Sequence, residues 1–402
     1  MKSILFVINT LGMGGAERAL LNLFKYMDLD KYEVSLYVLT GQGELFDQIP
    51  EEINLLNKRI FPVSVHSKYG RIRLMITLIK AVITRAVLIR RTGYILKNLF
   101  AMVRKGKIRK DKLLWKLLSD GGQIFEKEYD LAVAYLEGGS AYYVDSHVKA
   151  RKKAAFIHIN YSEAGYTRKL DEECYLNYDH IFAVSEKVKE KFLLVYPECM
   201  KTTAIFYNLI DVDKILSGST EKGGFSDSYD GFRILTVGRL VPQKALGTAV
   251  EAMRILKETG RAFRWYVLGE GEMRKSLEEQ IRSYGLCEDF FLLGTAANPY
   301  PFYRQCDLYV HTARYEGKSI AIEEAQVIGC AIVITDYDGA EEQIENGVDG
   351  IVCEATAEAL AAEILKLADN PQKLAELKHA SLIRKQVNNV KEIAKLEVLL
   401  TS

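Results

Sequence analysis

The stretch of sequence with the clearest chemical potential holds two carboxylates, Glu316 and Glu324, eight residues apart. It follows the apolar run 307–312, and its spacing predicts a strand, a short loop and a helix that begins near Ser319. The free N–H groups at the start of such a helix favour an anion. Glu324, one to two turns into the helix, could accept hydrogen bonds from two neighbouring hydroxyls. A phosphate on the amides and a diol on the carboxylate describe a nucleoside diphosphate, although both glutamates could equally be solvated charges.

Two cations follow another predicted strand. Arg239 and Lys244 come just after the apolar run 232–237. Arginine binds phosphate through two parallel N–H groups, and lysine acts as a point charge. In a transferase whose leaving group is a nucleoside diphosphate, these charges would stabilise the departing group without a metal. The alternative is that both side chains are solvated in a surface loop.

Neighbouring patterns do not identify a P-loop or a metal site. Gly-Lys-Ser at 317–319 would need a glycine at position 312 to form a P-loop, and Thr312 stands there. The spacing of Asp336 and Asp338 recurs elsewhere in the chain, so it carries no weight. The six cysteines and six histidines show no metal-ligand spacing. We therefore predict no metal and no cofactor.

A glycine turn follows the first apolar run, 4–8. Its pattern, Gly12-x-Gly14-Gly15-x-Glu17, ends in Glu where a dinucleotide fingerprint has a small residue, so a dehydrogenase is a weak interpretation. Such a turn still lets a backbone approach a phosphate or sugar closely. The N-terminal run reads as a buried strand rather than a signal peptide, and the scattered cysteines are typical of a reduced, cytosolic protein.

Strand, turn and helix patterns repeat along both halves of the chain. A length of 402 residues suggests two domains, and the pattern restarts at Phe232 after a Gly- and Ser-rich segment, 217–231, which we interpret as a linker. We expect an α/β protein with two facing Rossmann-like halves, 1–216 and 232–385, and a cleft between them at the carboxyl ends of the strands. The tail 386–402 is predicted to be a helix that packs back on the first half.

One segment of the chain is strongly basic, although the net charge of the whole chain is only +1. Between Lys68 and Lys116 there are fifteen Lys and Arg residues and one acid, Asp111. Over 71–91 the pattern predicts a helix with two faces. The polar face would carry Arg73, Thr77, Lys80, Thr84 and Arg91, and the apolar face Leu74, Met75, Leu78, Ile79, Val82 and Ile83.

Charges interrupt this helix too often for a membrane span. We predict that the segment 68–116 lies in the plane of an anionic membrane surface. A solvated helical face, or an intramolecular match to the acidic remainder of the chain, stays an alternative. Nucleic acid is disfavoured because aromatic residues that could stack on bases are sparse here.

Taken together, several segments resemble the GT-B glycosyltransferases of family 4. GMGGAERALLNL (12–23) is similar to that family's first glycine loop and helix, and VGRLVPQK (237–244) to its diphosphate clamp. LGEGEMRKSLE (268–278) looks like its next strand, turn and helix. The segment that begins YEGKSIAIEEAQ (315–326) resembles its block of two glutamates separated by seven residues. The resemblance covers most of the C-terminal half and only the ends of the N-terminal half.

The resemblance implies a role for each matching residue. Arg239 and Lys244 would hold the donor diphosphate, Glu324 the ribose hydroxyls, and Glu316 would contact and orient the donor sugar. His158 looks like the family's histidine that contacts a sugar hydroxyl, with a core histidine as the alternative. The remaining donor-binding residues implied by the resemblance are Gly14, Gly15, Gly269, Gly317, Lys318, Ser319 and Ile320. The chain departs from the family at Ala245, where glycine is frequent, and alanine would be strained there if the position needs a positive φ.

We therefore expect a metal-independent, retaining glycosyltransferase with an acceptor domain (1–216) and a donor domain (232–385). It would move a sugar from a nucleotide-sugar, a UDP-sugar by the resemblance, to a membrane-associated glycan or lipid-linked acceptor in cell-surface polysaccharide synthesis. Its expected location is the cytoplasm, peripheral on the inner face of the cell membrane. A nucleotide-sugar epimerase and a catalytically silent binding protein on the same fold are the alternatives.

Overall fold

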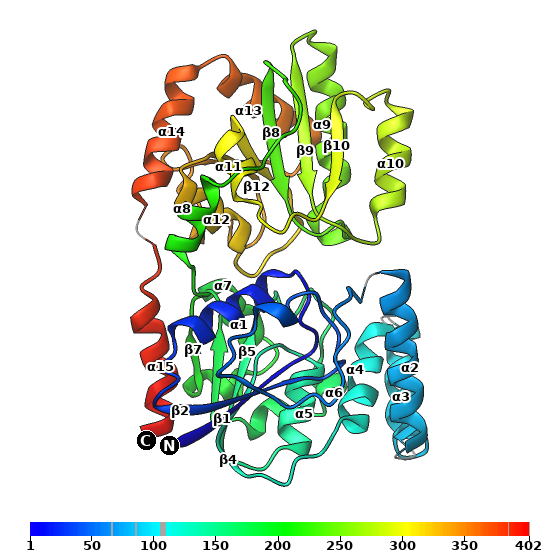
Figure 1. Ribbon diagram of the computed structural model, residues 1–402. Coiled ribbons are helices and arrows are strands. Elements are labelled where there is room, and N and C mark those ends of the chain that lie inside the picture. The colour runs from blue at the N-terminus through cyan, green and yellow to red at the C-terminus, as the bar shows by residue number, and fades with distance from the viewer. Residues whose placement is uncertain (66, 85–86, 105–109, 385, 402) are drawn as a thin grey trace. The chain divides into compact units, whose positions relative to one another are not determined.

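The computed structural model describes residues 1–65, 67–84, 87–104, 110–384 and 386–401. They form two compact units, one of Met1–Leu209 with Asn388–Ser402 and one of Ile210–Val387. Each unit has its own parallel sheet and its own buried apolar core (Figure 1). The predicted α/β class with two Rossmann-like domains is confirmed.

The first unit is built on a seven-stranded parallel sheet in the order β3-β2-β1-β4-β5-β6-β7. Its central strands are continuous apolar runs because both faces of the sheet are covered, as in β1, where Ile4 to Ile8 are all buried. The strands are β1 (Lys2–Ile8), β2 (Tyr32–Val38), β3 (Asn54–Leu55), β4 (Tyr129–Ala134), β5 (Ala150–Ile157), β6 (His180–Ala183) and β7 (Thr203–Ile205). The helices outside the basic segment are α1 (Gly15–Tyr26), α5 (Gly139–His147), α6 (Arg168–Asp171), α7 (Glu186–Leu193) and α15 (Asn389–Thr401).

The C-terminal helix α15 is part of this first unit. Ile393, Leu396 and Leu400 are buried in the core that also holds Phe6 and Phe24. The periodic spacing of these apolar residues, i, i+3 and i+7, is what gives α15 one buried face.

The basic segment forms three helices, α2 (Lys68–Thr84), α3 (Val87–Arg104) and α4 (Lys110–Gly121). Figure 1 shows them grouped at one side of the first unit. The single helix predicted over 71–91 is wrong, because Arg91 belongs to α3 rather than to the helix that carries Arg73 and Lys80. The side chains of Val82 and Thr84 lie outside the described residues.

The predicted apolar face of α2 is also divided in two. Leu74 and Leu78 pack against the core of the first unit. Met75, Ile79 and Ile83 instead remain 56%, 51% and 73% exposed. Sequence periodicity could not separate them, because apolar residues follow two different sides of this helix.

The second unit contains a six-stranded parallel sheet in the order β10-β9-β8-β11-β12-β13. The strands are β8 (Phe232–Val237), β9 (Phe263–Leu268), β10 (Phe290–Gly294), β11 (Leu308–His311), β12 (Ala331–Thr335) and β13 (Ile351–Cys353). The helices are α8 (Val212–Ser219), α9 (Leu246–Glu258), α10 (Arg274–Ser283), α11 (Tyr300–Gln305), α12 (Ile320–Ile328), α13 (Ala357–Ala368) and α14 (Pro371–Ile383). Within the described ranges, no helix combines the length and apolar character that crossing a membrane requires.

The division between the units falls at Leu209 and Ile210 rather than in 217–231. The interpretation of 217–231 as a linker missed its contacts with the second unit. The ring of Phe225 lies 4.4 Å from that of Tyr266, and Asp227 accepts hydrogen bonds from Arg233 and Tyr266. A few residues, among them Phe225 and Asp227, thus attach this segment to the second unit, although its Gly and Ser content is that of a free linker.

Candidate functional site

The carboxyl ends of β8 and β11 lie side by side where the strand order of the second sheet reverses. At such a switch point the loops leave on opposite faces and open a crevice that binds ligands in many α/β proteins. Arg239 and Lys244 follow β8, and Glu316 follows β11. The sheet topology therefore brings the predicted cations and the first predicted carboxylate to one edge.

Lys244 and Glu316 form an ion pair at this edge. Lys244 Nζ lies 3.0 Å from Glu316 Oε1, and their side chains are only 13% and 9% exposed. The Gln243 amide donates to the same oxygen at 2.8 Å and to Tyr315 O at 2.9 Å. Thr312 donates its hydroxyl to Lys244 O at 2.7 Å, which joins the two loops. Since the pair is largely removed from water, its charges interact more strongly than they would at the surface.

A buried histidine lies behind this pair. His311 Nε2 is 3.4 Å from Lys244 Nζ, and His311 Nδ1 is 3.2 Å from the Tyr309 hydroxyl. Burial, helped by the charge of Lys244, holds the pKa of His311 well below its ordinary value. The imidazole is therefore neutral, and because an ammonium can only donate, Nε2 accepts and Nδ1 carries the proton. The histidine supports the lysine without adding a positive charge.

Ala245, at the start of α9, adopts a left-handed backbone with φ 46° and ψ 34°. Position 245 thus has the positive φ at which alanine was expected to be strained. For a residue with a Cβ this conformation costs about 1–2 kcal/mol. The surrounding hydrogen bonds, including Thr248 N–H to Ala245 O, hold it in place.

Arg239 and Gly269 lie at the same edge of the sheet. Arg239 is exposed and makes no side-chain hydrogen bond or ion pair within the described part of the chain, so its guanidinium is available to an anion. Gly269 has φ 153°, and a Cβ there would lie 1.9 Å from Gly238 O. The glycine is thus required by the close crossing of two backbones, whether or not a ligand binds.

Helix α12 begins at the predicted position, with Ser319 as its N-cap and Ile320 as its first residue. Its first N–H groups have no acceptor within the helix. Gln343 fixes the entrance, because its side chain accepts from Ser319 N–H at 2.8 Å and donates to Ser319 O at 2.9 Å. Lys318 pairs with Glu323 at 2.8 Å, so a phosphate at this position would have to share that lysine.

Glu324 is buried, at 4% exposed, on the first turns of α12. The Tyr300 hydroxyl donates to its Oε1 at 3.3 Å and the Tyr303 hydroxyl to its Oε2 at 3.2 Å. Both contacts are long, and each carboxylate oxygen has a second lone pair. Glu324 is thus a buried carboxylate whose two oxygens each accept a hydrogen bond from a tyrosine.

In the first unit, His158 directly follows β5 and is buried. Its backbone N–H donates to Glu137 Oε2 at 3.1 Å, while Nε2 is buried with no hydrogen-bond partner among the described residues. Burial lowers the pKa of His158 to about 3, so the ring is neutral. Gly14 is the N-cap of α1 and Gly15 its first residue, at the carboxyl end of β1. All of these residues lie at the carboxyl edge of the first sheet.

Sequence reasoning missed several residues that shape these sites. Gln243 and His311 lie in the same segments as predicted site residues, yet no role was predicted for either. Gln343 and Glu137 come from loops whose sequence gives no signal of their contacts. Gln243 directly precedes the predicted site residue Lys244, so its position in VGRLVPQK could have indicated a role in the site.

Known proteins resemble this chain most clearly in its second unit. Residues 226–383 match the family model described as glycosyl transferases group 1. The two parallel-sheet domains are those of the GT-B fold, which a crystal structure of Anabaena HepE with UDP and glucose shares. That structure aligns over 100% of both chains with a TM-score of 0.69 and 18% sequence identity.

Two curated proteins are similar to parts of the chain. The amylovoran biosynthesis glycosyltransferase AmsK of Erwinia amylovora is 32% identical over 149 residues, 35% of this chain and 37% of that protein. The N-acetylgalactosamine-N,N'-diacetylbacillosaminyl-diphospho-undecaprenol 4-alpha-N-acetylgalactosaminyltransferase of Campylobacter jejuni is 30% identical over 175 residues, 43% of this chain and 46% of that protein. The chain thus matches less than half the length of either relative.

Proposed function

We propose that this protein is a retaining glycosyltransferase that moves a sugar from a nucleotide-sugar, specifically a UDP-sugar, to a lipid-linked or other membrane-associated glycan in surface-polysaccharide synthesis. The observation that carries this proposal is the cluster at the switch point of the second sheet. Lys244 is held there against Glu316 at 3.0 Å, with the exposed Arg239 on the same edge. The cluster lies inside the segment that matches the glycosyl transferases group 1 model.

The reaction breaks the bond between the anomeric carbon and the diphosphate oxygen and forms a bond from that carbon to an acceptor hydroxyl oxygen. The hydroxyl proton leaves with the nucleoside diphosphate. Arg239 and Lys244 would stabilise the negative charge that grows on the diphosphate, in the role that a metal fills elsewhere. Glu316, fixed by Lys244 and Gln243, would orient the donor sugar.

The remaining predicted residues have roles of recognition. Glu324 would hold the ribose hydroxyls through its two carboxylate oxygens, and the start of α12 would bind phosphate oxygens. We propose that His158 binds a sugar hydroxyl, since its buried Nε2 has no partner among the described residues. Gly14 and Gly15 are proposed to lie near the transferred sugar and phosphate.

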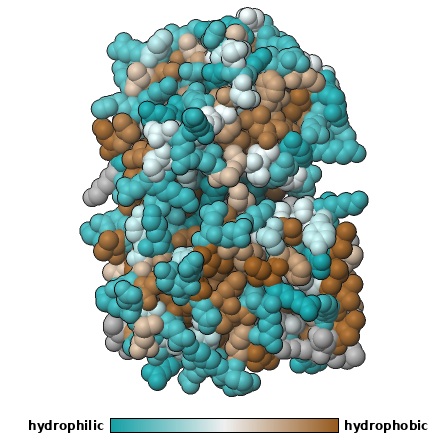
Figure 2. Space-filling model, in the orientation of Figure 1, coloured by the Kyte–Doolittle hydropathy of each residue, from teal (hydrophilic) through white to brown (hydrophobic). Residues whose placement is uncertain are grey.

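The acceptor is proposed to be at a membrane because of the surface of α2 and α3. Ile79 and Ile83 of α2 are 51% and 73% exposed, and Phe100 of α3 is 71% exposed. Figure 2 shows brown, apolar atoms at the lower right edge, over these helices. The same segment holds fifteen Lys and Arg residues and one acid, and Lys68 and Arg71 are exposed. Apolar residues beside cations suit an anionic leaflet, and we place the protein on the cytoplasmic face of the membrane.

The similar Campylobacter transferase supports a lipid-linked acceptor, since its name states a diphospho-undecaprenol substrate. The solved complex of HepE with UDP and glucose supports the choice of uridine. Both are properties of those proteins, and they enter here only as support for the proposal.

The test is release of UDP from a panel of UDP-sugars, with and without a lipid-extracted membrane fraction as acceptor, in the presence and absence of EDTA. We expect UDP only when acceptor is present, and little effect of EDTA. A sugar isomer formed without acceptor would indicate the epimerase instead, and no turnover with any donor would indicate a silent binding protein. Loss of activity in EDTA that Mg²⁺ or Mn²⁺ restores would contradict the metal-independent reaction.

A further inference from the structure

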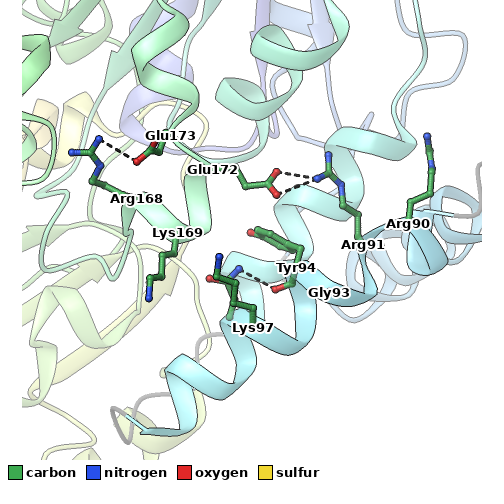
Figure 3. A pocket seen from close by; sticks show the side chains of 10 residues that line it. Arg90, Arg91, Gly93, Tyr94, Lys97, Arg168, Lys169, Glu172 and Glu173 are labelled. Atoms are coloured by element: carbon green, nitrogen blue, oxygen red, sulfur yellow. Dashed lines mark hydrogen bonds and ion pairs between the residues drawn. The ribbon is translucent and has the colours of Figure 1, made fainter.

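A polar pocket of about 500 Å³ lies between α3 and α6 of the first unit, and none of the residues proposed for sugar transfer lines it (Figure 3). Its volume is in the range of small-ligand sites. Five cations and two carboxylates line it, which leaves an excess of three positive charges. The cations are Arg90, Arg91, Lys97, Arg168 and Lys169, and the carboxylates are Glu172 and Glu173.

Both carboxylates are already matched by cations of the pocket. Arg91 Nη1 lies 3.0 Å from Glu172 Oε2, and Arg168 Nη2 lies 3.2 Å from Glu173 Oε1. Figure 3 shows these two contacts as dashed lines, one on each side of the loop that follows α6. Each of the two carboxylates of the pocket is therefore paired with one of its five cations.

The other three cations have no such partner within the described ranges. Arg90, Lys97 and Lys169 make no side-chain hydrogen bond or ion pair with any residue that the structure describes, and all three are exposed. Figure 3 shows Arg90 toward one end of the pocket and Lys97 and Lys169 toward the other. Like charges around one pocket repel, so an anion that binds among them relieves that repulsion.

The loop that forms one wall of the pocket is held in an uncommon conformation. Glu172 and Glu173 both adopt left-handed backbone, with φ 47° and 59°. Such residues persist only where their surroundings fix them. Here Lys116, whose side chain is only 2% exposed, adds a second ion pair to Glu172 at 3.1 Å. The wall is thus fixed before any ligand arrives, which lowers the entropic cost of binding.

The lining restricts the chemistry of the ligand. Tyr94 is buried and its hydroxyl donates to Leu170 O at 2.8 Å, so it offers no open ring for stacking a base. The free groups are guanidinium and ammonium, which bind compact oxyanions with several charges. We infer that this pocket binds a phosphate or diphosphate group, either free in solution or as the headgroup of a lipid. The exposed Leu96 and Phe100 on α3 would suit the lipid source.

Binding of an anion to this pocket can be measured without any assay of sugar transfer. Pyrophosphate is titrated by calorimetry into the full chain and into the triple variant Arg90→Gln, Lys97→Gln, Lys169→Gln. The matched control, Lys58→Gln, Arg59→Gln, Lys391→Gln, removes the same three charges from exposed positions on the first unit that do not line the pocket. A second arm measures sedimentation with phosphatidylcholine vesicles that contain farnesyl diphosphate or, separately, phosphatidylglycerol.

We expect the triple variant to bind pyrophosphate about tenfold more weakly or worse, and the control variant to bind as the wild type does. Stronger binding to farnesyl diphosphate vesicles than to phosphatidylglycerol vesicles, with the difference lost in the triple variant, would support the pocket with a lipid headgroup as its ligand. Lys97→Glu, a single exposed change, repeats the test if the triple variant unfolds. Pyrophosphate binding that the triple variant loses, with no difference between the two lipids, would support the free anion as the ligand. Equal affinity of the pocket and control variants for pyrophosphate, or no pyrophosphate binding by the wild type, would overturn the assignment.

Discussion

Lys244 Nζ lies 3.0 Å from Glu316 Oε1, so the cation proposed for the leaving group and the carboxylate proposed for the donor sugar hold each other in place. The two residues come from loops after different strands, β8 and β11. Neither loop could move far without separating a largely buried pair, and leaving one charge unpaired is costly. The geometry therefore fixes both groups before a donor binds.

Arg239 and Lys244 are predicted to differ in their effect on stability. Lys244→Ala leaves Glu316 buried without its cation and should lower the free energy of unfolding by about 1–3 kcal/mol. Arg239→Ala removes an exposed side chain and should leave the midpoint of thermal unfolding unchanged. Both changes should reduce kcat more than donor affinity, because charge on the diphosphate grows in the transition state.

Arg239→Lys is the matched control, since it keeps the charge and loses the paired N–H groups. We expect an intermediate kcat for this variant. If Arg239→Ala retained full turnover, the arginine would have no part in the leaving-group site.

Ala245→Gly should stabilise the protein. Relief of the left-handed alanine gains about 1–2 kcal/mol, and the greater freedom of glycine in the unfolded chain costs about 0.5–1 kcal/mol. The expected net gain is between about 0 and 1.5 kcal/mol, measured by urea unfolding. Ala249→Gly, in the regular part of α9, should instead destabilise. A loss of stability in Ala245→Gly would show that the strain is not released by removing the Cβ.

His158 should make the protein sensitive to acid. Its pKa is about 3 in the folded protein because of burial, against about 6.5 in an unfolded chain. Between these values the unfolded state binds the extra proton, so stability is fully present above about pH 6.5 and falls as the pH decreases toward 3. Relative to His158→Gln, the wild type should lose roughly 2–3 kcal/mol of unfolding free energy between pH 6.5 and 4. Parallel stability curves for the two proteins would contradict this.

Membrane attachment through α2 is predicted to need its exposed apolar side. In flotation with liposomes, binding should grow with anionic lipid and fade with salt. Ile79→Gln with Ile83→Gln should reduce it about a hundredfold or more, since each buried apolar side chain contributes about 1.5–3 kcal/mol. Leu194→Gln with Met200→Gln, at exposed positions outside the basic segment, should have no effect. Equal recovery on neutral and anionic vesicles would argue against an electrostatic surface.

The order of strands and helices could be predicted because apolar runs and glycine turns alternate regularly. The expected strand 308–311 and the helix that begins near Ser319 appear as β11 and α12. Short edge strands such as β7 and β13, of three residues each, were missed because so few residues carry no usable periodicity.

The contacts that fix the candidate site could be predicted only in part. The family resemblance implied two separate roles for Lys244 and Glu316, but only the parallel register of β8 beside β11 shows that they meet. Glu324 was expected to accept hydrogen bonds from two hydroxyls of a ligand. Its contacts with Tyr300 and Tyr303 depend on the packing of α11 against α12, which no local pattern encodes.

The most direct test of a nucleotide-sugar site in the second unit is calorimetric titration of UDP, with GDP and ADP for comparison, into the wild type and Glu324→Gln. Glu324 should hold the ribose hydroxyls by charge-assisted hydrogen bonds worth about 1.5–3 kcal/mol. We predict that the wild type binds UDP in preference to the other two nucleotides. The variant should bind UDP roughly ten- to a hundredfold more weakly, with an unchanged fold. Absence of nucleotide binding by the wild type, or equal affinity in the variant, would contradict the proposed site.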